Sequence, residues 1–203
     1  MDFSTLNESS LHNTLKNYYA IQTNGKTEVK LHNHIYDIYT ETNQVIEIQT
    51  QNLVKILPKI LDTLEKNIKV KVVFPLVTEK RIIVTDEKQN IISKRKSPKK
   101  NCIYELFSEL TGFYPALLHK NFTLEVLLTH ITEERIKTDK PVQSKNNRRR
   151  FKRDWNKSNK HLDKIIDTIT FSSKEDYINL LPKELENEFC AKDINKILKE
   201  NNY

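Results

Sequence analysis

The sequence is poor in glycine, in cysteine and in long apolar runs, and each shortage excludes a class of protein. Two of the 203 residues are glycine, so no glycine-rich phosphate-binding loop is present. Cys102 and Cys190 are far apart and have no zinc-like spacing, which indicates a reducing compartment. No apolar stretch approaches the roughly 18 residues of a membrane-spanning helix. The acidic, polar N-terminal stretch does not resemble a secretory signal, and we therefore expect a cytoplasmic protein without a membrane partner.

Charge, by contrast, is abundant and unevenly distributed. Charged residues make up 30% of the chain and hydrophobic residues 37%, which is typical of one globular α/β core with a small appended unit. Residues 88–160 contain 18 Lys and Arg against 7 Asp and Glu, between acidic flanks. A basic middle region of this kind predicts binding to a phosphate backbone; the alternative is an ordinary solvated surface.

The first part of the chain alternates between helical and strand patterns. Residues 4–19 have the apolar spacing of an amphipathic helix, and two strands are expected over 28–33 and 34–41. A turn at Thr42-Asn43 leads into the strand VIEIQT, which completes an antiparallel meander. Residues 53–67 have helical spacing with a kink or late start at Pro58, and residues 69–77 predict a buried strand. The predicted order is α-β-β-β-α-β.

The second part is more polar and is expected to be mainly helical. A hairpin turning at residues 87–90, a helix near 103–111 and a strand near 122–131 come first. Helices are then expected near 155–170, 173–181 and 191–200, with Trp155 as a core anchor at the start of the first. We expect residues 1–136 to form the α/β core, 137–154 a basic linker or loop, and 155–203 a helical extension.

Two carboxylates and a glutamine stand on adjacent predicted strands. Asp37 is on the second strand, and Glu47 and Gln49 are two apart on the third, so their side chains share a face. The carbonyl of Ile48 is a third candidate oxygen ligand. Hard oxygen ligands suit Mg²⁺, or Mn²⁺ in its place, which keeps waters that can act as nucleophile.

This arrangement resembles the PD-(D/E)xK nuclease superfamily, with Asp37 as the first acid and Glu47-Ile48-Gln49 as the (D/E)-x-K element. The predicted α-β-β-β-α-β order is similar to that family's common core, over roughly residues 4–77. The resemblance implies a restriction-endonuclease-like mixed sheet and a Mg²⁺-dependent phosphodiesterase, in which Asp37, Glu47 and Ile48 hold the metal.

The sequence departs from the family pattern at Gln49, where the family has lysine. Gln49 can orient water but supplies no charge, so another cation is needed beside the developing negative charge. Lys59 on the following helix is the first candidate and Lys55 the second; the superfamily tolerates a lysine that has migrated in this way. Glu8 and His12, four residues apart on the first helix, are accessory candidates.

Two dense basic segments are the candidate nucleic-acid contacts. Arginine and lysine bind phosphate, and interleaved aromatic residues can stack on bases. The predicted contacts are Lys94, Arg95, Lys96, Lys99 and Lys100 in the first segment and Arg148, Arg149, Arg150, Lys152 and Arg153 in the second. For each segment the alternative is a flexible, solvated loop.

The tail around Phe189 and residues 191–194 resembles the opening of a winged-helix unit, and the whole chain is similar to uncharacterised prokaryotic proteins with a nuclease-like core and such a tail. The resemblance favours a Mg²⁺-dependent DNA endonuclease acting on double-stranded DNA. A catalytically inactive nucleic-acid-binding or regulatory module and an RNA-directed nuclease stay open, and so does a homodimer.

Overall fold

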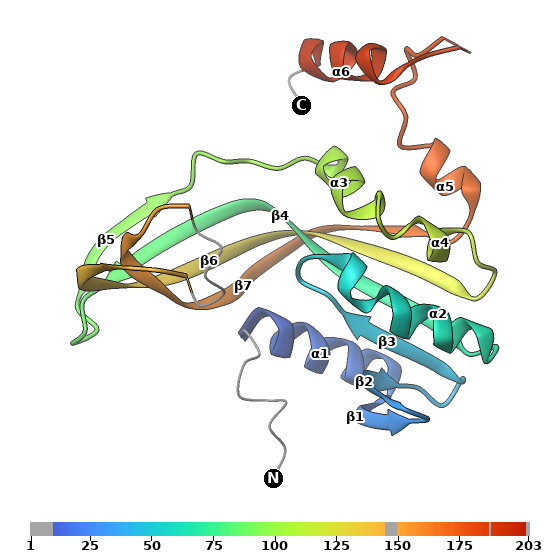
Figure 1. Ribbon diagram of the computed structural model, residues 1–203, viewed down its shortest axis with the longest axis horizontal. Helices are drawn as coiled ribbons and strands as arrows, with labels where there is room; N and C mark the ends of the chain where they lie inside the picture. The colour runs from blue at the N-terminus through green and yellow to red at the C-terminus, as the bar shows by residue number, and fades with distance from the viewer. Residues whose placement is uncertain (1–9, 145–149, 187, 202–203) are drawn as a thin grey trace.

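A computed structural model describes residues 10–144, 150–186 and 188–201 (Figure 1). In chain order the elements are α1 (Ser10–Thr23), β1 (Lys26–Leu31), β2 (His34–Tyr39), β3 (Gln44–Ile48), η2 (Leu53–Ile56), α2 (Leu57–Glu65), β4 (Lys69–Thr85), β5 (Ile91–Lys96), η3 (Ile103–Glu105), α3 (Leu106–Leu110), α4 (Tyr114–Leu117), β6 (Phe122–Val142), β7 (Arg153–Phe171), α5 (Lys174–Ile178) and α6 (Ala191–Glu200). The protein is an α/β protein, as expected.

The strands form one mixed, open, seven-stranded sheet. Its order is β1-β2-β3-β4-β6-β7, with β5 paired to β4 at one end. β1, β2 and β3 form the predicted antiparallel meander, whereas β3, β4 and β6 are parallel neighbours and β7 returns antiparallel to β6. Parallel neighbours require crossover connections, and the first of these contains α2. The predicted α-β-β-β-α-β order is confirmed, and the helix at 53–67 does start late, with Pro58 in the first turn of α2.

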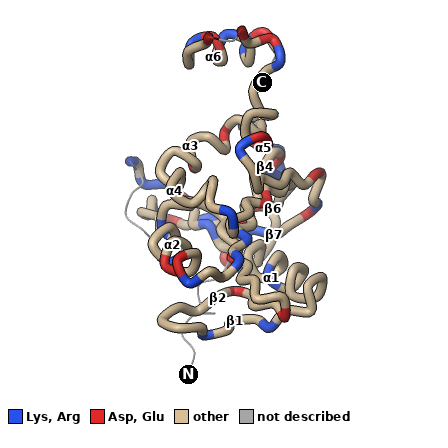
Figure 2. The backbone as a smooth tube through the Cα atoms, turned by 90° about the vertical axis from the view of Figure 1, so that its right-hand side faces the viewer, with Lys and Arg blue, Asp and Glu red and all other residues tan. Residues whose placement is uncertain are grey.

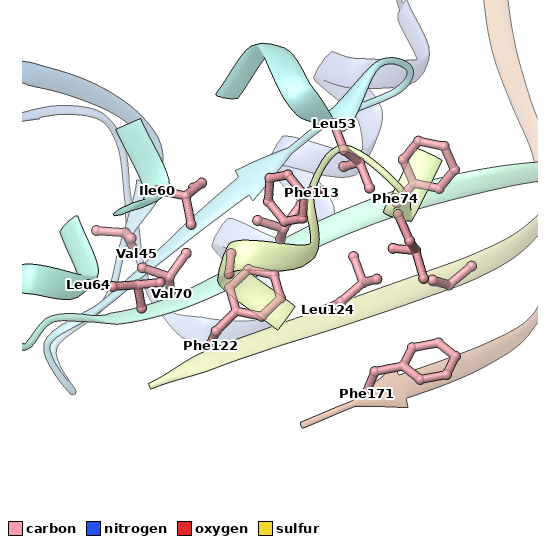
Figure 3. Packing of buried hydrophobic residues seen from close by; sticks show 14 of the residues in the cluster. Val45, Leu53, Ile60, Leu64, Val70, Phe74, Phe113, Phe122, Leu124 and Phe171 are labelled. Carbon is pink, nitrogen blue, oxygen red and sulfur yellow. The ribbon is translucent and has the colours of Figure 1, made fainter. Parts of the chain in front are cut away.

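Two apolar layers enclose the first half of the sheet. On one face, Val45, Val70 and Val72 pack against α2, α3 and α4, and the labelled aromatic rings of Figure 3 fill this layer. On the other face, Ile46, Ile48 and Val73 pack with Leu11 and Leu15 of α1. Figure 2 shows α2 and α1 on either side of the strands. The side-chain period of two in a strand sends alternate residues of β3 to opposite layers, which explains why Val45, Ile46 and Ile48 are all buried.

Beyond this covered half, β4, β6 and β7 continue as a long, polar arm. The strands contain 17, 21 and 19 residues, much more than the predicted strands at 69–77 and 122–131. We define the extension as residues 78–85 of β4, all of β5, residues 130–142 of β6 and residues 153–164 of β7. Every residue of β5 is exposed. In Figure 1 the extension curves past the N-terminal end of α1.

The helix predicted over residues 155–170 is wrong, because this segment is strand β7. Leu162, Ile165, Ile166 and Ile169 have the i, i+3, i+4, i+7 spacing of a helix. In the structure, register shifts in the β6–β7 pairing move the apolar residues out of strict alternation, which imitates that spacing. Trp155 is therefore a half-exposed strand residue and not a helix anchor.

The expected basic linker at 137–154 is also partly strand. Residues 137–142 complete β6 and Arg153 begins β7, while residues 145–149 lie outside the described parts of the chain. After β7 the helices α5 and α6 confirm helical structure near 173–181 and 191–200, although α5 is shorter than expected. No helix in the described residues is long and apolar enough to cross a membrane.

Asparagine residues occupy several backbone positions of the kind that glycine often occupies in other proteins. Asn24, Asn43, Asn52 and Asn67 adopt positive φ angles between 48° and 59° at the ends of helices or in turns. Asparagine tolerates this left-handed region better than most residues. At Gly25 an added Cβ would collide with the side chain of Ile38, so close packing of the chain explains this glycine.

Candidate active site

Asp37 and Glu47 meet at the point where β2 and β3 separate. The two strands pair at Ile38–Ile46 and Tyr39–Val45, and one step further Asp37 stands opposite Glu47. The Asp37 backbone N–H donates to Oε1 of Glu47 at 3.2 Å, and the Ile48 N–H donates to Oδ2 of Asp37 at 2.8 Å. Each carboxylate therefore accepts a hydrogen bond from a backbone N–H of the opposite strand, in place of a carbonyl oxygen of the sheet. The sequence prediction that these two residues lie together agrees with this geometry.

The two carboxylates have opposite electrostatic environments. Glu47 is 6% exposed, and its burial, together with the negative charge of Asp37, raises its pKa to about 7 against the opposing effect of Lys59. Burial also acts to raise the pKa of Asp37, but the hydrogen bond and charge of His12 and the N–H of Ile48 outweigh it and lower the pKa. At neutral pH the site therefore holds an ionised carboxylate, Asp37, beside a second carboxylate, Glu47, that is partly protonated.

Lys59 of α2 is the cation next to Glu47. Its Nζ donates to Oε1 of Glu47 at 2.6 Å and also to the carbonyl oxygen of Ile35, and it lies 4.6 Å from the ring centroid of Tyr36. The Lys59 side chain is 20% exposed. Lys55, the second candidate, lies in η2 and is exposed. Of the two lysines proposed from the sequence, the structure brings Lys59 to the carboxylate pair.

His12 approaches Asp37 from α1, on the other side of the sheet from Lys59. Its Nε2 lies 3.3 Å from Oδ2 of Asp37, and both side chains are 17% exposed. The carboxylate pair is thus held between the two helical layers, with one basic group on each side. The helix residue proposed as an accessory is in contact with the predicted site, whereas Glu8 lies outside the described residues.

Gln49 and Ile48 lie at the end of β3 but have different roles in the structure. The side-chain Nε2 of Gln49 donates to the carbonyl oxygens of Gln51 and Asn52, at 2.6 Å and 3.1 Å, and so supports the loop that follows. Ile48 presents its N–H to Asp37, as described above, and buries its side chain against α1. The proposed roles of Gln49 in orienting water and of the Ile48 carbonyl in metal binding stay predictions.

Tyr36 and Thr63 form a support for Lys59 that the sequence did not reveal. The Tyr36 hydroxyl lies 2.6 Å from the Thr63 hydroxyl, which in turn donates to the carbonyl oxygen of Lys59. Tyr36 is buried and places its ring beneath the Lys59 ammonium. The four-residue spacing of Lys59 and Thr63 on one helix was the available signal, but the contact to a strand tyrosine depends on the tertiary packing.

The donor set at the carboxylate pair fits a hard cation. The contacts described above are made by Oδ2 of Asp37 and Oε1 of Glu47, and carboxylate oxygens are the ligands that hard cations prefer. Over residues 10–144, 150–186 and 188–201 there is no cluster of three or more His, Cys, Asp and Glu side chains suited to a metal ion. Mg²⁺ is commonly bound by one or two carboxylates with waters and substrate oxygens. This pair therefore suits Mg²⁺ or Mn²⁺ better than a structural zinc.

The predicted basic contacts are at the surface, away from the carboxylate pair in sequence. Lys94, Arg95 and Lys96 are exposed on β5, where Lys96 lies 2.5 Å from Glu79, and Lys99 and Lys100 are exposed after it. Arg150, Lys152 and Arg153 are exposed at the start of β7, whereas Arg148 and Arg149 lie outside the described residues. All of the described members belong to the extension or to the segments that adjoin it.

A family model described as "Domain of unknown function (DUF8091)" matches residues 9–172. The chain belongs to the DUF8091 family. The match ends one residue after β7, so the DUF8091 region contains the whole sheet together with the carboxylate pair, and α5 and α6 follow it.

One relative extends the similarity over nearly the whole chain. An "Uncharacterized protein" of Treponema pallidum (strain Nichols) is 26% identical over 194 residues, which is 96% of this chain and 74% of that protein. No solved structure matches the chain.

Proposed function

We propose that this protein is a Mg²⁺-dependent DNA endonuclease of the PD-(D/E)xK type, with Mn²⁺ as the alternative ion. The observation that carries the proposal is the contact between Asp37 and Glu47 at the separating ends of β2 and β3, with Lys59 bound to Glu47. The core order α-β-β-β-α-β around this pair is the arrangement that the family resemblance implies.

Asp37 and Glu47 would hold the ion through their carboxylate oxygens. The ion supplies an activated water and neutralises charge on the scissile phosphate. The raised pKa of Glu47 has a direct consequence, because a proton must leave Glu47 before its carboxylate can bind a cation. Binding is therefore expected to strengthen as the pH rises from 6 to 8.

Lys59 would supply the positive charge that Gln49 lacks. Glu47, the Ile35 carbonyl and the Tyr36 ring fix the position of its ammonium group before any substrate binds. A preorganised cation stabilises charge that develops on a phosphoryl group without the cost of reorientation. His12 would hold Asp37 in place and keep it ionised, as a positioning residue.

Divalent-ion-dependent nicking of supercoiled plasmid tests this proposal. We expect Asp37→Ala and Glu47→Ala to lower the nicking rate by about 10³-fold or more, and Lys59→Ala by about 10²-fold, as for the loss of one preorganised charge. Lys55→Ala is the matched control, because it removes the same charge from the same segment and is expected to leave the rate unchanged. Chelation with EDTA should abolish nicking by the unaltered protein.

Two results would contradict the endonuclease. Nicking by Glu47→Ala at the rate of the unaltered protein would show that activity comes from elsewhere or from a contaminant. Absence of nicking with both Mg²⁺ and Mn²⁺, on plasmid and on single-stranded substrates, would rule out DNA cleavage; RNA substrates in the same assay test the RNA-directed alternative.

A nucleic-acid-binding module with an inactive core is the second candidate. The Lys59–Glu47 and His12–Asp37 contacts favour it, because each carboxylate already has a basic side chain of the protein as its partner. It predicts that duplex DNA binds with equal affinity in the presence of Mg²⁺ and of EDTA, and that it is not cut.

A further inference from the structure

In the extension, a single buried carboxylate lies close to basic side chains from three strands. Glu133 of β6 has a side chain that is 2% exposed. Its Oε1 accepts hydrogen bonds from Nε and Nη2 of Arg135 at 2.8 Å and 2.6 Å. Its Oε2 lies 3.0 Å from Nζ of Lys157 on β7 and 3.6 Å from Nζ of Lys80 on β4. We refer to Lys80, Glu133, Arg135, Lys157 and Lys160 as the Glu133 cluster.

The cluster has more positive charge than its carboxylate can balance. Burial opposes ionisation of Glu133, but Lys157, Arg135 and Lys80 lower its pKa to about 2, so it is ionised at any physiological pH. Lys160 stands opposite Glu133 in the register of β6 and β7. Burial, with the charges of Lys157 and Lys80 nearby, lowers the pKa of Lys160. Four cations thus surround one anion, and a bound anion would relieve their mutual repulsion.

The cluster lies on the face of the sheet that α1 covers. Ile131 and Leu162 belong to the same two strands and pack in the apolar layer of α1. The N-terminal end of α1 contacts β7 directly, because the Ser10 N–H donates to Oδ1 of Asn159 at 3.1 Å. His12, two residues further along α1, lies close to Asp37. The first turn of α1 therefore contacts both β7, at Asn159, and Asp37 of the carboxylate pair.

The basic residues of β7 form a row. Arg153, Lys157 and Lys160 span residues 153–160, which is about 23 Å of strand at a rise of about 3.3 Å per residue. Over that length one strand of a DNA duplex presents about seven phosphates, at 3.4 Å of helix axis each. Lys157 is 45% exposed and Lys80 29%, so both ammonium groups can reach a ligand while they contact Glu133.

Trp155 is arranged for packing rather than for stacking on a base. The guanidinium of Arg135 lies 3.7 Å from the centroid of its ring, and that of Arg153 lies 5.4 Å away. Proteins that bind single strands use open aromatic faces as stacking platforms. Because an arginine covers this ring at close contact, the surface offers charge and little stacking, which suits the backbone of a duplex.

From these observations we infer that the Glu133 cluster and Arg153 bind the phosphate backbone of a DNA duplex on the α1 face of the extension. The inference deepens the proposed function and rests on it for the choice of DNA. The first basic segment, on β5, is not required for this surface. Glu133 acts as a spacer that holds Arg135, Lys157 and Lys80 at fixed positions, so that the surplus charge is preorganised for phosphates.

Fluorescence anisotropy with a labelled 20-base-pair duplex tests the inference. We expect Lys157→Gln/Lys160→Gln to weaken binding by at least tenfold at about 50 mM salt, and to reduce the slope of log K against log[salt] by about 2, since each phosphate contact contributes about 0.9. The matched control is Lys69→Gln/Lys164→Gln, which removes two exposed lysines that lie outside the cluster. Equal losses in the two double variants would overturn the inference, since net charge alone would then explain binding.

A second measurement leaves the protein unaltered and so does not depend on the folding of a variant. Lysines are acetylated with and without the duplex, and the modified positions are read by mass spectrometry. Lys80 and Lys157 are expected to be protected at least fivefold and Lys69 not at all. Protection confined to residues outside the cluster would overturn the inference. Tighter binding of a single-stranded 20-mer or of an RNA duplex than of the DNA duplex would overturn the choice of ligand.

The failure of this inference can be told apart from the failure of the proposed function. Glu47→Ala is expected to bind the duplex as tightly as the unaltered protein, because Glu47 is not part of the Glu133 cluster. Duplex binding that depends on Lys157 and Lys160, without any nicking, would support the surface and reject the endonuclease. If Lys157→Gln/Lys160→Gln nicks plasmid and binds the duplex as the unaltered protein does, the surface would be rejected and the endonuclease supported.

Discussion

The covered half of the sheet and its extension are built from the same strands but are stabilised in different ways. In the first half of β4 and β6, residues such as Val72 and Leu124 are fully buried between helices on both faces. In the second half, Glu133 and Arg135 are buried beside a smaller number of apolar residues such as Ile82 and Ile131, and β5 is exposed throughout. Apolar burial stabilises the covered half, whereas ion pairs across strands organise the extension. A strand can therefore continue far beyond the core that specifies it.

The two candidate sites follow this division. In the covered half, the pair Asp37–Glu47 places two acids together and leaves one of them with a raised pKa. In the extension, Glu133 has an excess of cations and a lowered pKa. An acidic centre suited to a metal ion and a basic surface suited to phosphates thus share one sheet, and four predictions test the comparison.

The largest expected effect is on the apolar half. Phe122→Ala removes a ring that is 1% exposed and lies 5.7 Å from the ring of Phe113. We expect the free energy of unfolding to fall by about 3–5 kcal/mol. Ile92→Ala on β5 is the control; its side chain is 49% exposed, and a change within about 0.5 kcal/mol is expected. Urea unfolding followed by circular dichroism gives both values. Equal losses of unfolding free energy in the two variants would contradict the difference between the covered half and the extension.

Glu133→Gln tests the ionic half. It leaves Arg135, Lys157 and Lys80 without their common partner, and we expect a loss of about 2–4 kcal/mol, since breaking a buried ion pair exposes uncompensated charge. Glu79→Gln is the control; it removes the partner of Lys96, which is 55% exposed, and should leave the unfolding temperature nearly unchanged. Thermal unfolding at low and high salt checks this. The loss for Glu133→Gln should shrink with salt, and a loss independent of salt would point to packing instead.

Glu47→Gln is expected to stabilise the protein at high pH. The pKa of Glu47 is raised to about 7 from an ordinary value of 4.5, so the folded state holds an extra proton between these values. The free energy of unfolding therefore falls as the pH rises through that window. Glutamine has no such proton to lose, and we expect a gain of about 1–2 kcal/mol at pH 8, after allowing for the lost Lys59 contact, and little gain at pH 5. A variant that is destabilised equally at both pH values would contradict the raised pKa.

The smallest effect concerns Trp155. Trp155→Phe keeps an aromatic ring over Arg135 but weakens the cation–π contact, and a loss of about 0.5 kcal/mol is expected, with about 1 kcal/mol for Trp155→Leu. Urea unfolding by circular dichroism measures both. A loss above about 2 kcal/mol for Trp155→Phe would mean that the residue is a core anchor, and the extension would then resemble the covered half.

Local sequence pattern was sufficient for the covered half of the fold. The pattern of apolar residues in β2, β3 and α2 depends on how many faces of each element are buried. The period of that pattern could therefore be read directly from the sequence. The same reasoning failed for residues 155–170, because register shifts between β6 and β7 placed Leu162, Ile165 and Ile169 at helical spacing. Where long-range pairing decides the period, a local pattern can suggest the wrong element.

The candidate site shows the same limit. Strand assignment alone was enough to bring Asp37 and Glu47 together, and the helix after β3 offered Lys59 as the first candidate and Lys55 as the second. Selecting Lys59 required the position of α2 over β3, together with the Tyr36 ring and the Ile35 carbonyl that hold the ammonium group. Gln49 has a role that strand geometry did not predict, because its side-chain amide donates hydrogen bonds to the loop that follows β3.

By itself, the sequence determined which segments of residues 10–77 are helices or strands and which acids share a hairpin, since residue type and spacing act over a few neighbouring positions. It also determined that the middle of the chain is basic. Only the tertiary structure decided that β7 lies beside β6, that Lys59 rather than Lys55 contacts Glu47, and that Lys80, Arg135 and Lys157 meet at Glu133. Those contacts join residues from separate elements, and their energies depend on burial and distance, which no local pattern encodes.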